Sequence, residues 1–307
     1  MLDRASTFAQ PEIVDLLKTQ FVPIAIDQAY QRRQKDTEGD FFRKIAGQSP
    51  RNNFNSTTQG FYIVTANGDL LLYNNNRNPE KLLRLMKERL KEFELSHRRN
   101  EPINLIQPTK IDPRYNVAPP SGGLVVRLHA KVLSGYEPTT NRWRKIFQSA
   151  VSRDNLWITA DEHQQLVAGR FTKSLQQRIA RFHLVDNTRG EPPMWRAEEV
   201  VSIQLEVNPN ETDRNFRQIT GSASLKNRSG DRTYDAKLLG EIKIESNRVV
   251  QLDMVCLGQF SGEGPYTRGA PKGNFPLAIR FSLADGNDVA DSIPPQGSRG
   301  WVDGYLK

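Results

Sequence analysis

The sequence has little of the chemistry on which many catalytic and metal sites depend. It contains one cysteine, Cys256, among 307 residues. A single cysteine cannot form an intrachain disulfide, a Cys-x-x-Cys redox pair, or a zinc site built on two or four cysteine ligands. A cytosolic protein and an exported protein without disulfides look the same in this respect, so the cysteine count leaves the compartment open.

The histidines and the clustered acidic residues likewise indicate no catalytic or metal site. The four histidines show no HExxH or HxH spacing; they are His97, His129, His163 and His183. The run Asp161-Glu162-His163 begins a predicted helix, where carboxylates interact well with the helix dipole. Asp285, Asp288 and Asp291 resemble a calcium loop only loosely, because the twelfth-position glutamate is missing, and we interpret them as turn residues. We therefore predict neither a metal nor a cofactor.

Long apolar runs and dense basic runs are missing as well. No stretch approaches the ~18 apolar residues that span a bilayer, and charged residues within the first twenty positions do not fit a signal peptide. The sequence thus predicts a soluble protein, cytoplasmic or exported after removal of a signal. The net charge of +8 is carried by scattered doublets such as Arg32-Arg33, which favours a solvated basic surface over a nucleic-acid site.

The length of the chain and a stretch rich in proline and glycine predict two domains. The chain exceeds the ~100–200 residues of a typical domain. Five prolines and the run Ser121-Gly122-Gly123 fall between residues 96 and 123. We predict a first domain at 1–98, a Pro/Gly-rich linker at 99–123 and a β-rich domain at 124–307.

The first domain alternates predicted helices and strands. Pro11 opens a helix, 21–26 is an almost wholly apolar strand, and 37–46 is a helix that Gly47 ends. Asn67-Gly68 then supplies the turn of a hairpin between 60–65 and 69–73. A last helix follows, capped by Asn78 and opened by Pro79.

This order resembles the later part of a thioredoxin-like fold across about residues 5–95. The segments PEIVDLLKTQFVPIAID and GFYIVTANGDLLLY carry the resemblance. It implies redox cysteines that would precede Met1 and a cis-proline within 56–59, where this sequence has none. We therefore expect a redox-inactive module whose groove is a docking surface. Strand 21–26 would need a neighbour, either from upstream sequence or from 103–106 or 124–128.

The second domain is predicted to be mainly antiparallel β with two short helices. A strand at 124–133 is followed by a helix from a Thr159/Glu162 capping box to Val167 and by a helix at 174–182. Five further strands are predicted at 199–207, 218–226, 232–245, 248–259 and 274–284. Such a meander can close into a small barrel or form one sheet of a sandwich.

Two features of this domain are assigned to its core. Cys256 follows Val250, Leu252 and Met254 at a spacing of two residues, so we expect all four side chains to point inward. Trp301 and Tyr305 are expected to dock the C-terminal segment onto the sheet.

The loop at 260–273 is the candidate binding site. It combines four glycines with the polar side chains of Glu263, Tyr266, Arg268 and Lys272. Long loops with exposed Tyr and Arg are often binding surfaces, although a plain strand connector remains the alternative. Arg268 and Lys272 favour an anionic ligand over a cationic one.

Two functions of different class follow. The first is a non-enzymatic module that binds an unidentified protein or a small anionic ligand. The alternative is a hydrolase with its site in the β-domain or between the domains. Because the sequence offers no nucleophile–base pair, we assign no catalytic residues and favour the first.

Overall fold

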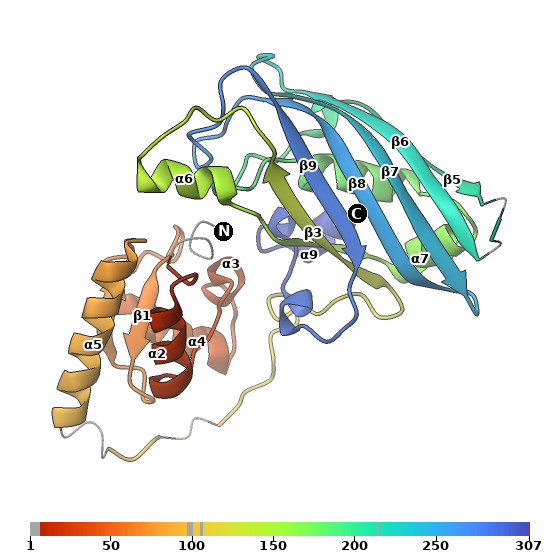
Figure 1. Cartoon of the computed structure of the whole chain (residues 1–307). Helices are drawn as coiled ribbons and strands as arrows, with labels where there is room; N and C mark the ends of the chain where they lie inside the picture. Colours follow the sequence, from red (N-terminus) through yellow and green to blue (C-terminus); the bar gives the residue numbers. More distant parts are fainter. Residues whose placement is uncertain (1–6, 97–100, 105–106, 211, 214) are drawn as a thin grey trace. The chain divides into compact units, whose positions relative to one another are not determined.

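The computed structural model describes residues 7–96, 101–104, 107–210, 212–213 and 215–307 (Figure 1). The chain divides into two compact units, Asp3–Val117 and a larger one that holds Ala118–Lys307. Within the described residues, no helix has both the length and the apolar character needed to cross a bilayer.

The smaller unit packs helices around a two-stranded sheet. The helices are α2 (Pro11–Gln20), α3 (Gln28–Gln31), α4 (Thr37–Gly47) and α5 (Pro79–Leu95), and the antiparallel strands are β1 (Phe61–Val64) and β2 (Leu70–Asn74). Ile13 of α2 is buried against Leu82 and Met86 of α5, with Phe61 and Ile63 of β1 packed alongside. Apolar residues three and four apart on both helices produce this core.

Several sequence predictions for this unit are confirmed. The hairpin turns at Gly68, whose φ of +84° is a conformation that glycine adopts without strain. The Asn78 side chain accepts a hydrogen bond from the Lys81 N–H at 2.8 Å, and Pro79 opens α5 as expected. Helix α4 begins after Asp36, whose carboxylate accepts from the Gly39 N–H at 3.1 Å.

The predicted strand at 21–26 was wrong. The chain is extended at Phe21 and at Asp27, but no strand forms between them and the sheet contains only β1 and β2. Neither proposed neighbour is available, because 124–128 pairs within the larger unit and 103–104 forms no strand; 105–106 lie outside the described residues. Apolar β-formers alone do not make a strand when no partner edge exists.

Part of the Pro-rich segment predicted as a linker is bound to the smaller unit. The Thr37 and Thr109 residues exchange N–H to Oγ1 hydrogen bonds of 3.0 and 2.8 Å. The Asp112 carboxylate accepts from the Lys35 N–H at 2.9 Å, and its own N–H donates to Asp36. Residues 107–112 therefore run along the start of α4.

The larger unit is a curled, seven-stranded antiparallel sheet with helices, a half-barrel (Figure 1). Its spatial order is β4-β3-β9-β8-β7-β6-β5. The strands are β3 (Leu124–Val132), β4 (Asp154–Ile158), β5 (Val200–Pro209), β6 (Phe216–Lys226), β7 (Thr233–Glu245), β8 (Arg248–Ser261) and β9 (Asn274–Leu283). The predicted meander is thus β5 to β9, and β3 and β4 extend it beyond β9.

The sheet does not close into the barrel that the sequence allowed. Strands β4 and β5 lie at opposite edges and do not pair with each other among the described residues. Helical segments pack on the sheet instead, with α7 against β8 and α8 against β5. They are α6 (Arg142–Ser149), α7 (Ala160–Val167), α8 (Lys173–Arg178), α9 (Val302–Leu306), the π-helical η2 (Ile179–His183), and the 3-10 turns η3 (Ala197–Glu199), η4 (Val289–Ser292) and η5 (Gln296–Ser298).

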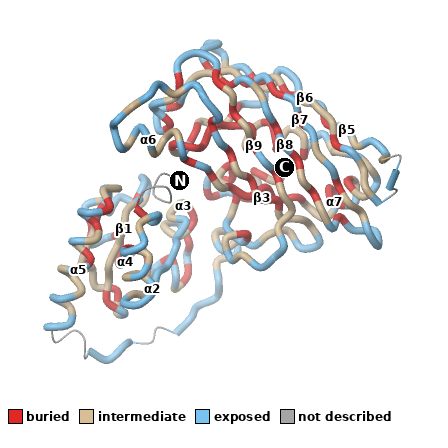
Figure 2. The backbone as a smooth tube through the Cα atoms, viewed as in Figure 1, coloured by how far each residue is buried: buried red, intermediate tan, exposed pale blue. Residues whose placement is uncertain are grey.

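Buried and exposed positions alternate along the long strands, as Figure 2 shows. Cys256 is fully buried, and burial raises the pKa of its thiol to about 12, so the predicted inert core cysteine is confirmed. Leu252 and Met254 are buried with it, but Val250 is exposed. The register shifts between Lys243 and Ile244 opposite this point, which turns Val249 inward in place of Val250.

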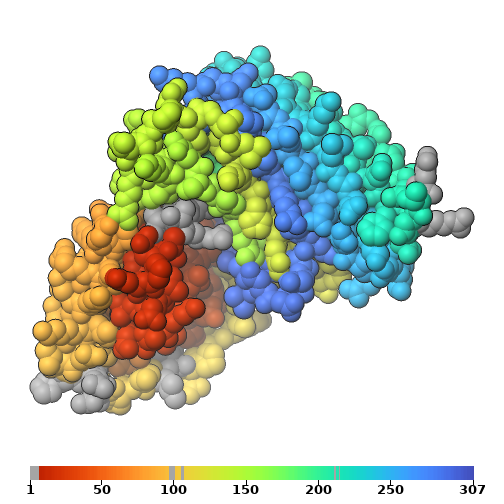
Figure 3. Space-filling view, viewed as in Figure 1, coloured from red at the N-terminus to blue at the C-terminus, as the bar shows by residue number. Residues whose placement is uncertain are grey.

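Two further expectations need correction. Tyr305 is buried as predicted, whereas Trp301 is 55 % exposed and its ring lies against Gly304 of α9. Strand β4 was missed because its sequence, Asp-Asn-Leu-Trp-Ile, does not alternate: every position is buried. On the face of the sheet that is turned to the viewer, no helix lies over β7, β8 and β9 in Figure 1, and blue to cyan atoms form the surface there in Figure 3.

Candidate functional site

The helix that begins after Thr172 changes its winding half-way along. Thr172 Oγ1 caps α8 by accepting from the Leu175 N–H at 3.1 Å, and α8 continues directly into the π-helical η2. A π-turn accommodates an extra residue and is common at functional positions. Here it brings Arg178 and His183, five residues apart, both into the interior, where each is 3 % exposed.

Arg178 is bound by a carboxylate and by three carbonyl groups. Its guanidinium donates to Glu162 Oε2 at 2.7 Å and to the carbonyl oxygen of Trp157 at 3.2 Å. It also donates to the carbonyl oxygens of Tyr305 at 3.0 Å and Leu306 at 2.6 Å. Arg178 therefore ties α7, β4 and the end of α9 together, and Glu162 compensates its charge.

His183 lies between an aspartate and a tyrosine. Its Nε2 is 2.6 Å from the Tyr305 hydroxyl, and its Nδ1 is 3.2 Å from Asp154 Oδ2, a charge contact that is not aligned as a hydrogen bond. Burial raises the pKa of Tyr305 well above its usual range, so the hydroxyl stays protonated. All three side chains are buried, and their contacts link η2 to β4 and α9.

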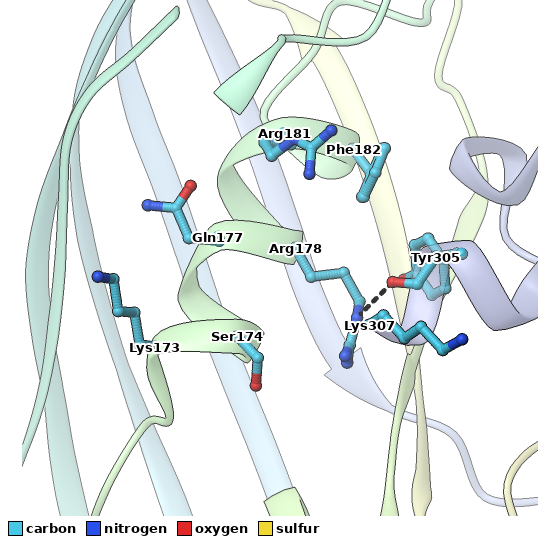
Figure 4. A pocket seen from close by; sticks show the side chains of 9 residues that line it. Lys173, Ser174, Gln177, Arg178, Arg181, Phe182, Tyr305 and Lys307 are labelled. Atoms are coloured by element: carbon cyan, nitrogen blue, oxygen red, sulfur yellow. Dashed lines mark hydrogen bonds between the residues drawn. The ribbon is translucent and has the colours of Figure 1, made fainter. Parts of the chain in front are cut away.

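A cavity of about 280 Å³ opens beside this cluster, between α8–η2 and α9 (Figure 4). It is lined by Lys173, Ser174, Gln177, Arg178, Arg181, Phe182, Gly304, Tyr305 and Lys307. The set contains four cationic side chains, two neutral polar side chains, two aromatic rings and no carboxylate side chain. We call it the cationic pocket. Its volume is near the lower end of the ~300–1,000 Å³ of ligand pockets.

The positive charge of the cationic pocket is largely uncompensated. Arg178 is paired with Glu162, but Lys173, Arg181 and Lys307 form no ion pair with any described residue. Arg181 stacks over the Phe182 ring with its guanidinium carbon 4.8 Å from the centroid. Comparison with family models, curated proteins and solved structures gives no match. The lining of this pocket is therefore described by its charge, which is positive and attracts negatively charged groups.

The loop residues singled out from sequence lie elsewhere on the larger unit. The Glu263 carboxylate accepts from the Gly269 N–H at 2.7 Å and the Ala270 N–H at 3.2 Å, so it closes its own loop. Tyr266, Arg268 and Lys272 are exposed, and none of them lines the cationic pocket. The loop is also held by a buried side chain, because Arg189 donates to the Thr267 carbonyl oxygen at 3.0 Å.

The acidic turn at 285–291 is held by arginines. Asp291 accepts from Arg127 at 2.7 and 2.6 Å and from Arg153 at 2.7 Å. Asp285 also accepts from Arg127, and Asp288 accepts from Arg153 at 2.6 Å. Within the described ranges, no group of three or more His, Cys, Asp or Glu side chains is arranged to hold a metal ion. The three aspartates form an ion-pair network.

His163 and Glu162 have the structural roles expected at a helix start. The capping box predicted from Thr159 and Glu162 is confirmed, with hydrogen bonds of 3.0 and 3.3 Å. His163 Nδ1 lies 3.0 Å from the Gly122 carbonyl oxygen, and its Nε2 accepts from the Val249 N–H at 3.2 Å. His163 thus links α7 to two neighbouring segments.

Sequence reasoning missed the residues of the cationic pocket. Lys173, Gln177 and Arg181 recur at intervals of four, a pattern that any solvated helix face shows. Lys307 follows α9, which is far from α8 in the sequence. The π-turn that directs Arg178 and His183 inward has no sequence signature. Only the tertiary fold brings these side chains together.

The Glu162–Arg178 pair should make stability depend on acidity. Burial alone would raise the pKa of Glu162, but hydrogen bonds from Arg178 and from the Thr159 N–H outweigh it and lower that pKa from its ordinary 4.5. Because the pKa of Glu162 is lower in the folded state than in the unfolded state, its ionised carboxylate stabilises the fold at a pH above the unfolded-state pKa. This stabilisation is lost as the pH falls through the folded-state pKa.

We therefore expect the urea midpoint of the wild type to fall more steeply between pH 5.5 and pH 3 than that of Glu162→Gln. Glu198→Gln, at an exposed carboxylate, is the matched control and should keep the wild-type slope. Equal slopes for wild type and Glu162→Gln would show that the pair does not titrate with folding.

Proposed function

We propose that this protein is a non-catalytic binding protein that takes a small anionic ligand in the cationic pocket. The observation that carries this proposal is the group of three cations, Lys173, Arg181 and Lys307, without a carboxylate among the lining side chains. Hydrogen bonds to charged groups contribute about 1.5–3 kcal/mol each, enough for such a set to select an anion. Ser174 and Gln177 add neutral polar groups, and Phe182 adds an apolar wall.

The contacts around the pocket favour binding over hydrolysis. Ser174 is the hydroxyl on the lining, and its Oγ contacts Glu162 at 3.0 Å and Thr172 at 3.0 Å; no hydrogen bond to a histidine is present among the described residues. The Tyr305 hydroxyl is bound to His183 Nε2 at 2.6 Å. A hydrolase needs a nucleophile activated by a base. The carboxylate beside Ser174 is Glu162, which is paired with Arg178 and has a lowered pKa, so it is a weak base.

For the smaller unit we propose a thioredoxin-like module that lacks redox activity and serves as an interaction surface. The support is the order of α2, α4, the β1–β2 hairpin and α5, together with the position of the sole cysteine in the larger unit. A disulfide exchanger needs an accessible thiolate and a partner thiol, whereas Cys256 is buried with a raised pKa.

The anion proposal can be tested with inorganic phosphate and citrate as probes at constant ionic strength. The variant Lys173→Met/Arg181→Met removes two pocket cations at exposed or half-buried positions. We expect the affinity for the probe that binds the wild type more tightly, measured by calorimetry, to fall about tenfold or more in this variant. The circular dichroism spectrum should be unchanged.

The matched control is Arg268→Met/Lys272→Met, which removes the same charge from the loop predicted from sequence. It should bind as the wild type does. If the loop variant loses affinity and the pocket variant keeps it, the loop is the binding site and the pocket proposal is wrong. Equal losses in both would indicate only general attraction by the basic surface.

A further inference from the structure

Arg181 differs from the two lysines of the cationic pocket because the fold holds its side chain in place. Its guanidinium carbon lies 4.8 Å from the centroid of the Phe182 ring, and its Nε donates to the Trp195 carbonyl oxygen at 3.4 Å. The Trp195 N–H donates in turn to the Arg181 carbonyl oxygen at 3.0 Å. The aromatic ring and the carbonyl group together orient the guanidinium.

The outer end of this guanidinium is open to a ligand. Within the part of the chain that the structure describes, neither Nη1 nor Nη2 of Arg181 has a hydrogen-bond or ion-pair partner. Arg181 is half-buried and lines the pocket, so these two nitrogen atoms face a space that a small molecule can enter. Because Nε is used by Trp195, a carboxylate or phosphate group accepts two parallel hydrogen bonds by meeting Nη1 and Nη2 end-on.

Arg178 is not available in the same way. Its Nε, Nη1 and Nη2 each donate to a protein oxygen already, at distances of 2.6 to 3.2 Å. Its charge is also compensated by Glu162. The arginine that presents free paired donors to the cationic pocket is therefore Arg181.

The two lysines reach the same pocket from other sides. Lys173 and Arg181 are eight residues apart, roughly 10–12 Å along a helix axis, and they lie toward opposite ends of the helical segment α8–η2 in Figure 4. Lys307 lies across from that segment, beside Tyr305 (Figure 4). A lysine is a point charge on a flexible stem, so it follows a negative group without fixing its orientation.

The charge of the lining indicates how many negative groups a ligand carries. A single carboxylate or phosphate group that meets Arg181 leaves Lys173 and Lys307 without a negative partner, because no carboxylate side chain lines the pocket. Each further negative group on the same ligand adds a contact with one of these lysines. The cavity of about 280 Å³ requires that these groups belong to one compact molecule.

We infer that the cationic pocket selects a compact ligand with two or more carboxylate or phosphate groups, one of which is held end-on by Nη1 and Nη2 of Arg181. This inference rests on the proposed function, since it concerns the same pocket. Arg181 sets the orientation of the ligand, and Lys173 and Lys307 add attraction for its other negative groups. Small polycarboxylates and short polyphosphates share this chemistry.

The number of charges can be tested with butyrate, glutarate and tricarballylate, which carry one, two and three carboxylates on similar carbon chains. At constant ionic strength we expect the affinity measured by calorimetry to rise about tenfold with each added carboxylate. Lys173→Met/Arg181→Met should abolish this rise. Arg268→Met/Lys272→Met removes the same charge outside the pocket and should keep it. Pyrophosphate and tripolyphosphate in the same assay show which of the two ligand classes binds more tightly.

The role of Arg181 can be tested with Arg181→Lys, which keeps the positive charge and removes the paired donors. We expect this variant to bind tricarballylate about tenfold more weakly than the wild type, because one charged hydrogen bond and the fixed orientation are lost. Lys173→Arg is the matched control. It also exchanges one cation for another, at a position where no fixed geometry is required, and should bind as the wild type does.

Equal affinities for butyrate and tricarballylate, or wild-type affinity in Arg181→Lys, would overturn the inference. The proposed function would stand in either case, provided that Lys173→Met/Arg181→Met weakens binding and the loop variant does not. If both double variants bind as the wild type does, or if none of the probes binds, the proposed function itself is wrong. The two failures therefore give different results.

Discussion

Replacing Arg178 by methionine is expected to lower the free energy of unfolding by about 3–5 kcal/mol, the usual cost of removing one partner of a buried ion pair. The substitution leaves the Glu162 carboxylate buried without its cation and leaves the carbonyl oxygens of Tyr305 and Leu306 without a donor. Urea denaturation followed by circular dichroism measures the change.

Arg181→Met is the matched control for this expectation. It removes the same chemical group from the same helical segment, but Arg181 is half-buried and makes one long hydrogen bond, of 3.4 Å to the Trp195 carbonyl oxygen. Its cost should be near ~0.5 kcal/mol. The double variant Glu162→Gln/Arg178→Met should be more stable than Arg178→Met alone, because it no longer buries an unpaired charge. Equal losses for Arg178→Met and Arg181→Met would contradict this account.

Replacing Arg189 by methionine should have an effect of similar size, about 3–5 kcal/mol, together with a local one. Arg189 is buried, pairs with the Asp186 carboxylate, and donates to the Tyr136 hydroxyl at 2.8 Å and to the Thr267 carbonyl oxygen. Its loss leaves Asp186 buried without a cation and frees the loop at 262–273 from the chain beneath it.

Two readouts separate these consequences. Urea denaturation reports the global loss, and limited trypsin digestion reports cleavage at Arg268 or Lys272 within the loop. We expect faster loop cleavage in Arg189→Met than in wild type under conditions where both are folded. Arg299→Met, at an exposed arginine paired with Glu191, is the control and should change neither measurement appreciably. Unchanged loop cleavage in Arg189→Met would mean that Glu263 alone holds the loop.

Local sequence signals located most helices and strands of both units. The Asn78 and Thr159 caps, the Asn67-Gly68 turn and the turn at Ser246-Asn247, where both residues have positive φ, act within a few residues and are readable directly. The alternation of apolar residues along β3 is a local signal of the same kind, and its positions Val126, Leu128 and Ala130 are buried.

The errors arose where partners are distant in sequence. The segment at 21–26 has the composition of a strand but no available edge, and β4 is a strand without alternation because both its faces are covered. The cationic pocket depends on a π-turn and on α9, so its charges could not be grouped from spacing. Binding at the loop 260–273 stays a prediction, in which Glu263 accepts two hydrogen bonds from the loop backbone while Tyr266, Arg268 and Lys272 are exposed.

The position of β3 in the sheet has a consequence for how the larger unit is synthesised. Val126 of β3 pairs with Leu283 of β9, and β9 is the last of the seven strands of this sheet to emerge from the ribosome. Pairs so far apart close a long loop, which slows folding. The meander from β5 to β8 can assemble hairpin by hairpin, but the edge of β3 that β9 occupies has no partner strand until β9 is made. During translation, β3 therefore presents an unpaired edge at which another strand or a chaperone can bind.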